Sequence, residues 1–242
     1  MFILIDSRNR IPNLSTSTSD FTIQLNNFLQ GDKVSLKDIQ IPNTVYNIRE
    51  GINDFMVWNR LGVDFDVQIP PGKYAITELL SVIQTEMNIA EANNYVLTYD
   101  INSMKTTITG DNTFILNFAT NPEQRSLYYE LGFNYADTPT APDHTGDNVI
   151  QLQRPVKILM QIKEFGTLGL TDQGIPFTFV IHLNGESGGI ISYTESIFYP
   201  QDVKVALRNF IKTLTIRLTY EDGSLADLNG ADFTLLLELE HH

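Results

Sequence analysis

Apolar and polar side chains alternate in short segments over most of the chain. Every second residue is apolar in these segments, and this period is typical of strands that bury one face. The clearest examples are residues 21–25, 156–162, 177–183, 214–218 and 233–237. Glycine, asparagine and aspartate residues, which favour tight turns, separate many of these segments. The pattern predicts a mainly β protein, built as an antiparallel sandwich or barrel.

The segment 33–41 changes the parity of its apolar positions. Val34 and Leu36 are two residues apart, and so are Ile39 and Ile41, but the two pairs fall on opposite parities. In a regular strand they would therefore point to opposite faces. Both pairs can face one core only if the strand bends or carries an extra residue, so the sequence predicts a β-bulge here.

One segment has a helical period. Apolar residues recur three or four positions apart from Ile76 to Met87, which predicts one amphipathic helix over Ile76–Ala90. A Pro-Pro-Gly turn at 70–72 precedes it. The segments expected after it are strands at 95–100, 105–110 and 114–118, then a helical turn at 126–131 that ends at Gly132.

The helix and the strands around it predict a separate module within the β chain. We expect an inserted α+β module at 63–146 and a β framework formed by 1–62 and 147–238. The last four residues, Leu-Glu-His-His at 239–242, are interpreted as the remnant of a histidine tag.

The charge and the missing cysteines exclude several classes of function. The 242 residues carry a net charge of −13 with 19% charged residues, so neither nucleic acid nor an anionic membrane is an expected partner. No cysteine is present, which excludes disulfides, thiolate zinc sites and cysteine nucleophiles. No apolar run is long enough to cross a bilayer, and the start lacks the basic region of a signal peptide.

The strongest match to a catalytic motif is Gly185-Glu186-Ser187-Gly188-Gly189, which fits G-x-S-x-G. A serine nucleophile needs a histidine base and an orienting acid. Outside the terminal pair, the histidines are His144, expected in a solvated loop, and His182, expected on the less buried face of its strand. We therefore interpret the motif as a hairpin turn and expect no catalytic, cofactor-binding or metal-binding residue, and no cofactor.

Two acidic segments and four tyrosines leave more than one interpretation. Asp64 and Asp66 are interpreted as the outward acids of a strand, and 227–232 as a turn that could hold a weak cation site. Glycan clefts usually carry several tryptophans, and this chain has only Trp58, which argues against a glycosidase cleft. Four tyrosines could anchor an interface or belong to a sandwich core: Tyr128, Tyr129, Tyr193 and Tyr199.

Three groups of segments carry a resemblance to a known family. They are 5–10, 19–23 and 39–48; then 69–74, 78–84, 96–100 and 130–133; and finally 214–218 and 227–233. In this order and spacing they resemble the minor capsid, or penton, proteins of virophages and polinton-like viruses. One departure is Ala75, which stands where such modules often begin the helix with serine or threonine, so a weaker cap is expected.

The resemblance implies a structural capsid protein with a single jelly roll and an inserted module. It implies a homopentamer at the five-fold vertices of an icosahedral virion, beside double-jelly-roll major capsid proteins, and synthesis in the host cytoplasm. The module would lie outside the shell, where it could contact a host or carrier-virus surface. Two alternatives are an attachment domain that binds a receptor and a β-sandwich hydrolase.

Overall fold

The computed structural model describes residues 1–29, 31–91, 93–120, 125–153, 155–184, 188–194, 201–204 and 211–240. The chain forms two compact units. The first comprises Met1–Val45 and Pro155–His242, and the second comprises Tyr46–Arg154. We call the second the inserted unit, because the chain leaves the first unit to form it and then returns.

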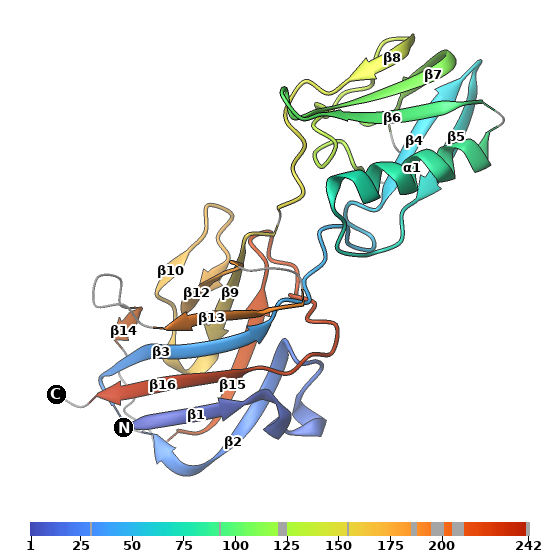
Figure 1. Cartoon of the computed structure of the whole chain (residues 1–242). Coiled ribbons are helices and arrows are strands. Elements are labelled where there is room, and N and C mark those ends of the chain that lie inside the picture. The colour runs from blue at the N-terminus through green and yellow to red at the C-terminus, as the bar shows by residue number, and fades with distance from the viewer. Residues whose placement is uncertain are drawn as a thin grey trace. The chain divides into compact units, whose positions relative to one another are not determined.

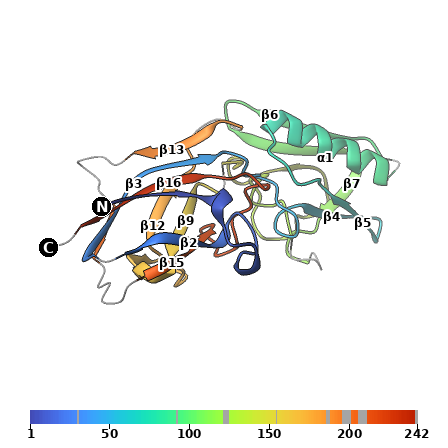
Figure 2. The same cartoon turned by 90° about the horizontal axis from the view of Figure 1, so that it is seen from below.

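Nine of the described strands make up the two large sheets of the first unit. One sheet has the order β1-β16-β3-β13, with β14 also paired to β3, and the other has the order β12-β9-β15-β2. Figure 2 shows them as two layers. The strands are β1 (Phe2–Asp6), β2 (Asp20–Leu29), β3 (Lys33–Pro42), β9 (Lys157–Ile162), β12 (Phe179–His182), β13 (Ile190–Thr194), β14 (Asp202–Lys204), β15 (Ile211–Thr219) and β16 (Thr234–Glu240).

The strand pairing is nested. β1 pairs with β16, β2 with β15, β3 with β13, and β9 with β12, and every pair is antiparallel. The first of these eight strands thus pairs with the last, and each following strand pairs with the next one inward. A long antiparallel hairpin rolled into two four-stranded sheets has this pairing, which is the jelly roll. The predicted fold class is confirmed.

Alternating side chains from both sheets form the core of the first unit. Phe21 from β2, Ile39 from β3 and Ile158 from β9 are all fully buried in one hydrophobic cluster. Burial of each such side chain contributes roughly 1.5–3 kcal/mol relative to exposure. The period of two that is visible in the sequence therefore supplies the main stabilisation of the sandwich.

The predicted bulge lies in β3. Leu236 of β16 faces Asp38, but its neighbour Leu237 faces Leu36, so Lys37 is the extra residue. This insertion changes the parity between Leu36 and Ile39, and both side chains are fully buried. The prediction is confirmed, because a bulge lets both apolar pairs face one core.

Short elements complete the first unit. Three single 3-10 turns are η1 (Ser7–Asn9), η2 (Pro12–Leu14) and η3 (Lys163–Phe165). Two very short strands, β10 (Gly169–Leu170) and β11 (Pro176–Phe177), form a hairpin in the connection between β9 and β12.

The inserted unit is an antiparallel sheet with a helix packed on it (Figure 1). The helix contacts β5 and β6 and contributes Leu79, Leu80, Ile83 and Met87 to a separate core. The sheet has the order β5-β4-β7-β6, with β8 also paired to β7. The elements are β4 (Phe55–Arg60), β5 (Val63–Gln68), α1 (Ile76–Ala90), β6 (Tyr95–Asp100), β7 (Lys105–Leu116) and β8 (Ala141–Thr145).

The structure corrects one strand assignment and agrees with the helical ones. The segments 105–110 and 114–118 are not two strands, since β7 continues through Gly110 to Leu116. Its first half pairs with β6 and its end with β4, so the polar residues between them are a bulged stretch and not a reversal of the chain. The predicted range of α1 agrees with the structure, and Gly132, at φ 80°, ends the turn that Leu131 closes on Leu127.

The two units differ from the ranges expected from the sequence. The inserted unit spans Tyr46–Arg154 and not 63–146, because β4 lies before residue 63 and pairs with both β5 and β7. The first two residues of the expected tag remnant lie in a strand of the jelly roll. Leu239 pairs with Val34, and both it and Glu240 belong to β16.

Candidate functional site

A hydrogen-bonded cluster joins η1 to the residues before β16. The hydroxyl of Ser7 is buried, donates to Oδ1 of Asp232 at 2.8 Å and accepts from the backbone N–H of Phe233 at 2.9 Å. Nη1 of Arg10 donates to the same oxygen of Asp232 at 2.6 Å and to the carbonyl of Ser7 at 2.9 Å. Two of the segments that carry the family resemblance, 5–10 and 227–233, therefore meet in one cluster.

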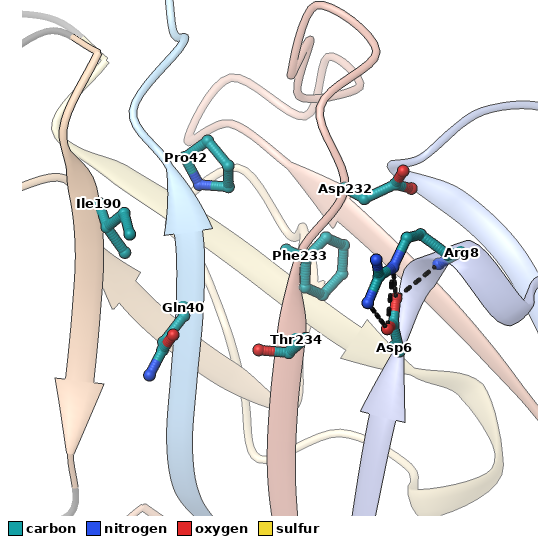
Figure 3. A pocket seen from close by; sticks show the side chains of 8 residues that line it. All are labelled: Asp6, Arg8, Gln40, Pro42, Ile190, Asp232, Phe233 and Thr234. Carbon is teal, nitrogen blue, oxygen red and sulfur yellow. Dashed lines mark hydrogen bonds and ion pairs between the residues drawn. The ribbon is translucent and has the colours of Figure 1, made fainter.

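An open depression of about 280 Å³ lies beside this cluster on the surface of the β1-β16-β3-β13 sheet. Its lining combines charged, amide and apolar side chains, which Figure 3 shows: Asp6, Arg8, Gln40, Pro42, Ile190, Asp232, Phe233 and Thr234. The guanidinium of Arg8 donates hydrogen bonds to Asp6 and holds the pKa of that carboxyl below its usual value. Both carboxylates of the lining, Asp6 and Asp232, already pair with arginines, so the depression offers a contact surface more readily than a proton-transfer site.

The structure describes only Gly188 and Gly189 of the G-x-S-x-G motif. Ser187 lies outside the described residues, together with Gly185 and Glu186. His182 is exposed on β12, as expected. His144 belongs to the inserted unit.

The prediction for His144 is wrong. Its side chain is only 4% exposed, and Nε2 lies 3.0 Å from the carbonyl oxygen of Phe114, whose ring it meets edge-on. Burial lowers the pKa of His144, because it disfavours the charged imidazolium. The loop composition around residue 144 did not reveal that β8 pairs with β7 and turns this side chain inward.

The structure agrees with the interpretation of Asp64 and Asp66 as outward acids of a strand and of 227–232 as a turn. Asp64 and Asp66 are exposed on β5, and Asp64 accepts a hydrogen bond from Asn59 at 2.6 Å. Asp227 accepts from the backbone of Asn229 within a turn. Among the described residues, no group of three or more histidine or acidic side chains could hold a metal ion.

The tyrosines divide between the two units. Tyr128 is half-buried in the inserted unit and packs against the rings of Phe118 and Tyr135. Tyr129 donates its hydroxyl to Gln151. Tyr193 is half-buried against the core of the first unit, and Tyr199 lies outside the described residues. Tyr128 and Tyr193 therefore pack against the cores of their units, whereas Tyr129 is partly buried but belongs to neither core cluster.

The sequence did not predict one buried carboxylate, that of Glu91. Glu91 follows the last residue of α1, and its side chain accepts hydrogen bonds from Trp58 and Tyr95 and pairs with Arg60. One signal was available, namely an acidic residue directly after a helix, where the helix dipole disfavours negative charge. Its partners lie in β4 and β6, which the sequence does not place beside the end of α1.

The fold places the first unit among the jelly-roll β-sandwiches. Over 98% of each chain, the structure is similar to the crystal structure of selenomethionine-labelled mavirus penton protein, with a TM-score of 0.51 and 11% identity. A scan against models of protein families found no match, and a search of curated proteins found no similar sequence. Within the described residues, no helix is long and apolar enough to span a membrane.

Proposed function

We propose that this chain is a structural capsid protein, a penton or minor capsid protein that self-associates as a homopentamer and closes the five-fold vertices of an icosahedral virion. One observation carries the proposal. The similarity to the mavirus penton protein covers 98% of each chain, so it extends over the jelly roll and the inserted unit together. A jelly roll alone supports many functions, but a jelly roll combined with an inserted unit, as in the mavirus penton protein, is compatible with fewer functions.

The surface of the first unit is compatible with a ring of identical copies. A five-membered ring needs two different surfaces on each copy, and the contact closes by rotation. Sheet edges are available on both sides of the sandwich: β1 and β2 end the two sheets on one side, and β13 and β12 end them on the other. The proposed partners are therefore other copies of this chain and a double-jelly-roll major capsid protein.

The proposal places the chain at the virion vertex after synthesis in the host cytoplasm. The net charge of −13 suits a position away from packaged DNA, because like charges repel. The inserted unit leaves the jelly roll between β3 and β9, and we place it outside the shell, where it would meet a host or carrier-virus surface. Neither nucleic acid nor membrane insertion has a part in this proposal.

Electron cryo-microscopy of particles that contain this chain tests the proposal. The expected density shows five copies around each five-fold axis, with the jelly roll in the shell and the inserted unit outside it. Density elsewhere in the shell, or vertices that lack the chain, would contradict the proposal. The proposal also assigns no catalytic activity, so a hydrolase activity that Ser187→Ala abolishes would contradict that part.

A second candidate function, attachment to a receptor, is favoured by the tip of the β4–β5 hairpin. Leu61 is 88% exposed and has φ 53°, and Gly62 follows at φ 81°, so the turn places a bulky apolar residue in the left-handed region. That conformation costs leucine roughly 1–2 kcal/mol. Strain of this kind often accompanies function, and an exposed apolar tip on the inserted unit suits contact with another surface.

Leu61→Asn separates attachment from simple strain. Asparagine suits this turn, so the variant should unfold at higher urea concentration than the parent. If the tip binds a receptor, the variant should also lose binding of the purified protein to host cells. Leu61→Met is the matched control, because it keeps an apolar tip. Unchanged cell binding of the asparagine variant would remove the attachment role of this residue.

A further inference from the structure

A groove of about 310 Å³ lies on one side of the jelly roll, between β1 and the 23–29 stretch of β2. These strands are the edges of the two sheets on this side. Phe2 and Leu4 are 63% and 73% exposed, although they stand in a regular strand. Two adjacent large apolar side chains at an open sheet edge are typical of an interface.

The backbone of β1 also faces this groove. The N–H of Leu239 in β16 donates to the carbonyl of Met1 at 2.8 Å. The N–H of Ser7 donates to the carbonyl of Phe233, directly before β16, at 3.0 Å. Antiparallel ladders alternate, so the N–H and C=O groups of Phe2 and Leu4 point away from β16. In the described part of the chain, β1 pairs with no other strand. This side therefore offers backbone donors and acceptors as well as apolar side chains.

The opposite wall of the groove is irregular and uncharged. Gln24 faces Thr213 of β15 and Leu29 faces Ile211, so four residues of β2 stand opposite one residue of β15. Two of these four, Asn26 and Asn27, are exposed, and their side-chain amides bond to none of the described residues. Amides of this kind can bond to the backbone of an arriving segment.

The charge of the groove favours another copy of the chain as its occupant. The chain has 29 acidic and 16 basic residues, so two copies repel each other over most of their surfaces. The groove contains one side-chain carboxylate, Asp6, and Arg8 already pairs with it. An equally acidic partner can approach here without an uncompensated carboxylate in its way.

An apolar counterpart to the groove lies next to the other edge of the same sandwich. The β10–β11 hairpin leads directly into β12, which is the edge strand opposite β2 in its sheet. Leu168 and Leu170 are 49% and 65% exposed, and residues two positions apart in extended chain share a face. The hairpin therefore presents two apolar side chains on the side of the unit that lacks the groove.

Hydrogen bonds hold this hairpin in place. Leu168 N–H donates to the carbonyl of Phe177 at 2.8 Å, and the hydroxyl of Thr178 donates to the carbonyl of Gly166 at 2.8 Å. A Cβ at Gly169 would lie 2.7 Å from the ring of Phe177, so that ring closes against the backbone. Because the hairpin is already ordered, it loses little conformational entropy when it docks.

We propose that the β10–β11 hairpin of one copy docks through Leu168 and Leu170 into the β1–β2 groove of the next copy. The hairpin and the groove lie at opposite edges of one sandwich, so the contact is heterologous and can repeat around an axis until it closes. This inference takes the second copy as occupant from the proposed self-association, but it does not depend on the number of copies in the ring.

Cysteine cross-linking of the full chain tests the contact, since the native chain has no cysteine. The double variant Leu4→Cys/Leu170→Cys, oxidised at high protein concentration, should give a ladder of linked species that ends at the closed ring. Leu4→Cys/Ile101→Cys is the matched control, because Ile101 is similarly exposed but lies in neither the hairpin nor the groove. It should give no ladder. The absence of a ladder, or an equal ladder in the control, would overturn the contact.

A second measurement does not depend on thiols. Leu4→Asp places a carboxylate in the groove and should raise the concentration needed for self-association at least tenfold in sedimentation, whereas Ile101→Asp should not change it. Rings of five that do not respond to Leu4→Asp would overturn the contact and leave the proposed function standing. Linked rings of three copies would support the contact between hairpin and groove but would contradict the proposed homopentamer. Cross-links formed only to an added major capsid protein would show that another partner fills the groove.

Discussion

Trp58 donates the hydrogen of its indole Nε1 to Oε2 of Glu91 at 3.1 Å, and both side chains are buried in the inserted unit. Tyr95 donates its hydroxyl to the same oxygen at 2.5 Å, and Arg60 pairs with the other one. The carboxylate stands at the end of α1, where the helix dipole is unfavourable for it. Its three partners compensate, and through them the helix end is joined to β4 and β6.

Glu91→Gln should destabilise the inserted unit strongly. The amide removes the negative charge that pairs with Arg60, and breaking a largely buried ion pair costs about 3–5 kcal/mol. Urea unfolding followed by Trp58 fluorescence measures the effect in this unit, because Trp58 is the chain's single tryptophan. Glu86→Gln on the same helix is the control, and its expected change is within about 0.5 kcal/mol. Equal effects of the two substitutions would show that the cluster does not stabilise the unit.

Ala75→Ser should stabilise α1. Glu78 accepts a hydrogen bond from the backbone N–H of Ala75 at 2.9 Å, which is one half of a capping box, but alanine has no oxygen for the other half. A serine hydroxyl supplies that acceptor and is worth about 1 kcal/mol. The midpoint of the urea transition of Trp58 should rise. Ala90→Ser, at the far end of the helix, should not raise it, and a rise there would point to a cause other than capping.

The stability of the inserted unit should fall as the pH falls below about 6.5. Burial lowers the pKa of folded His144 beneath its unfolded value, so its contribution is fully present above about pH 6.5 and is lost as the pH falls through the folded pKa. His144→Gln keeps a donor for the Phe114 carbonyl but cannot titrate. The difference in unfolding free energy between pH 7.5 and pH 5 should therefore be smaller in this variant. A difference as large as in the parent would exclude His144 as the cause.

Ser7→Ala should destabilise the jelly roll. The substitution leaves the buried N–H of Phe233 without its hydroxyl acceptor, and a buried donor of this kind costs about 1–3 kcal/mol. Differential scanning calorimetry should show a lower transition temperature for the first unit. Ser224→Ala, in an exposed turn between β15 and β16, provides a comparison with little expected effect. A variant that melts like the parent would show that the Ser7 cluster does not stabilise the sandwich.

Local periodicity was sufficient for much of the fold. The parity change between Leu36 and Ile39 predicted the bulge, because side-chain direction in a strand depends only on neighbouring residues. The range of α1 followed from its apolar spacing for the same reason. The continuous strand β7 did not follow, since an Asp-Asn pair after Gly110 reads as a turn until the partners on both sides are known.

The candidate site could be predicted less well, because its residues are distant in sequence. Segments 5–10 and 227–233 carry the resemblance to a family, but nothing local in either segment indicates that Ser7 and Asp232 bond to each other. His144 appeared solvated because its neighbours are polar, although pairing of β8 with β7 buries it. Glu91 was missed because two of its partners, Trp58 and Arg60, lie more than thirty positions before it.

The nested strand order has a consequence for biosynthesis. Phe2 pairs with Glu238, so the first strand of the jelly roll has no partner until residue 238 has left the ribosome. The inserted unit is continuous in sequence and has its own core, so it can fold while the rest is still being translated. Loop closure across so many residues is slow, and we expect newly made chains to expose β1 to β3 to chaperones before the sandwich closes.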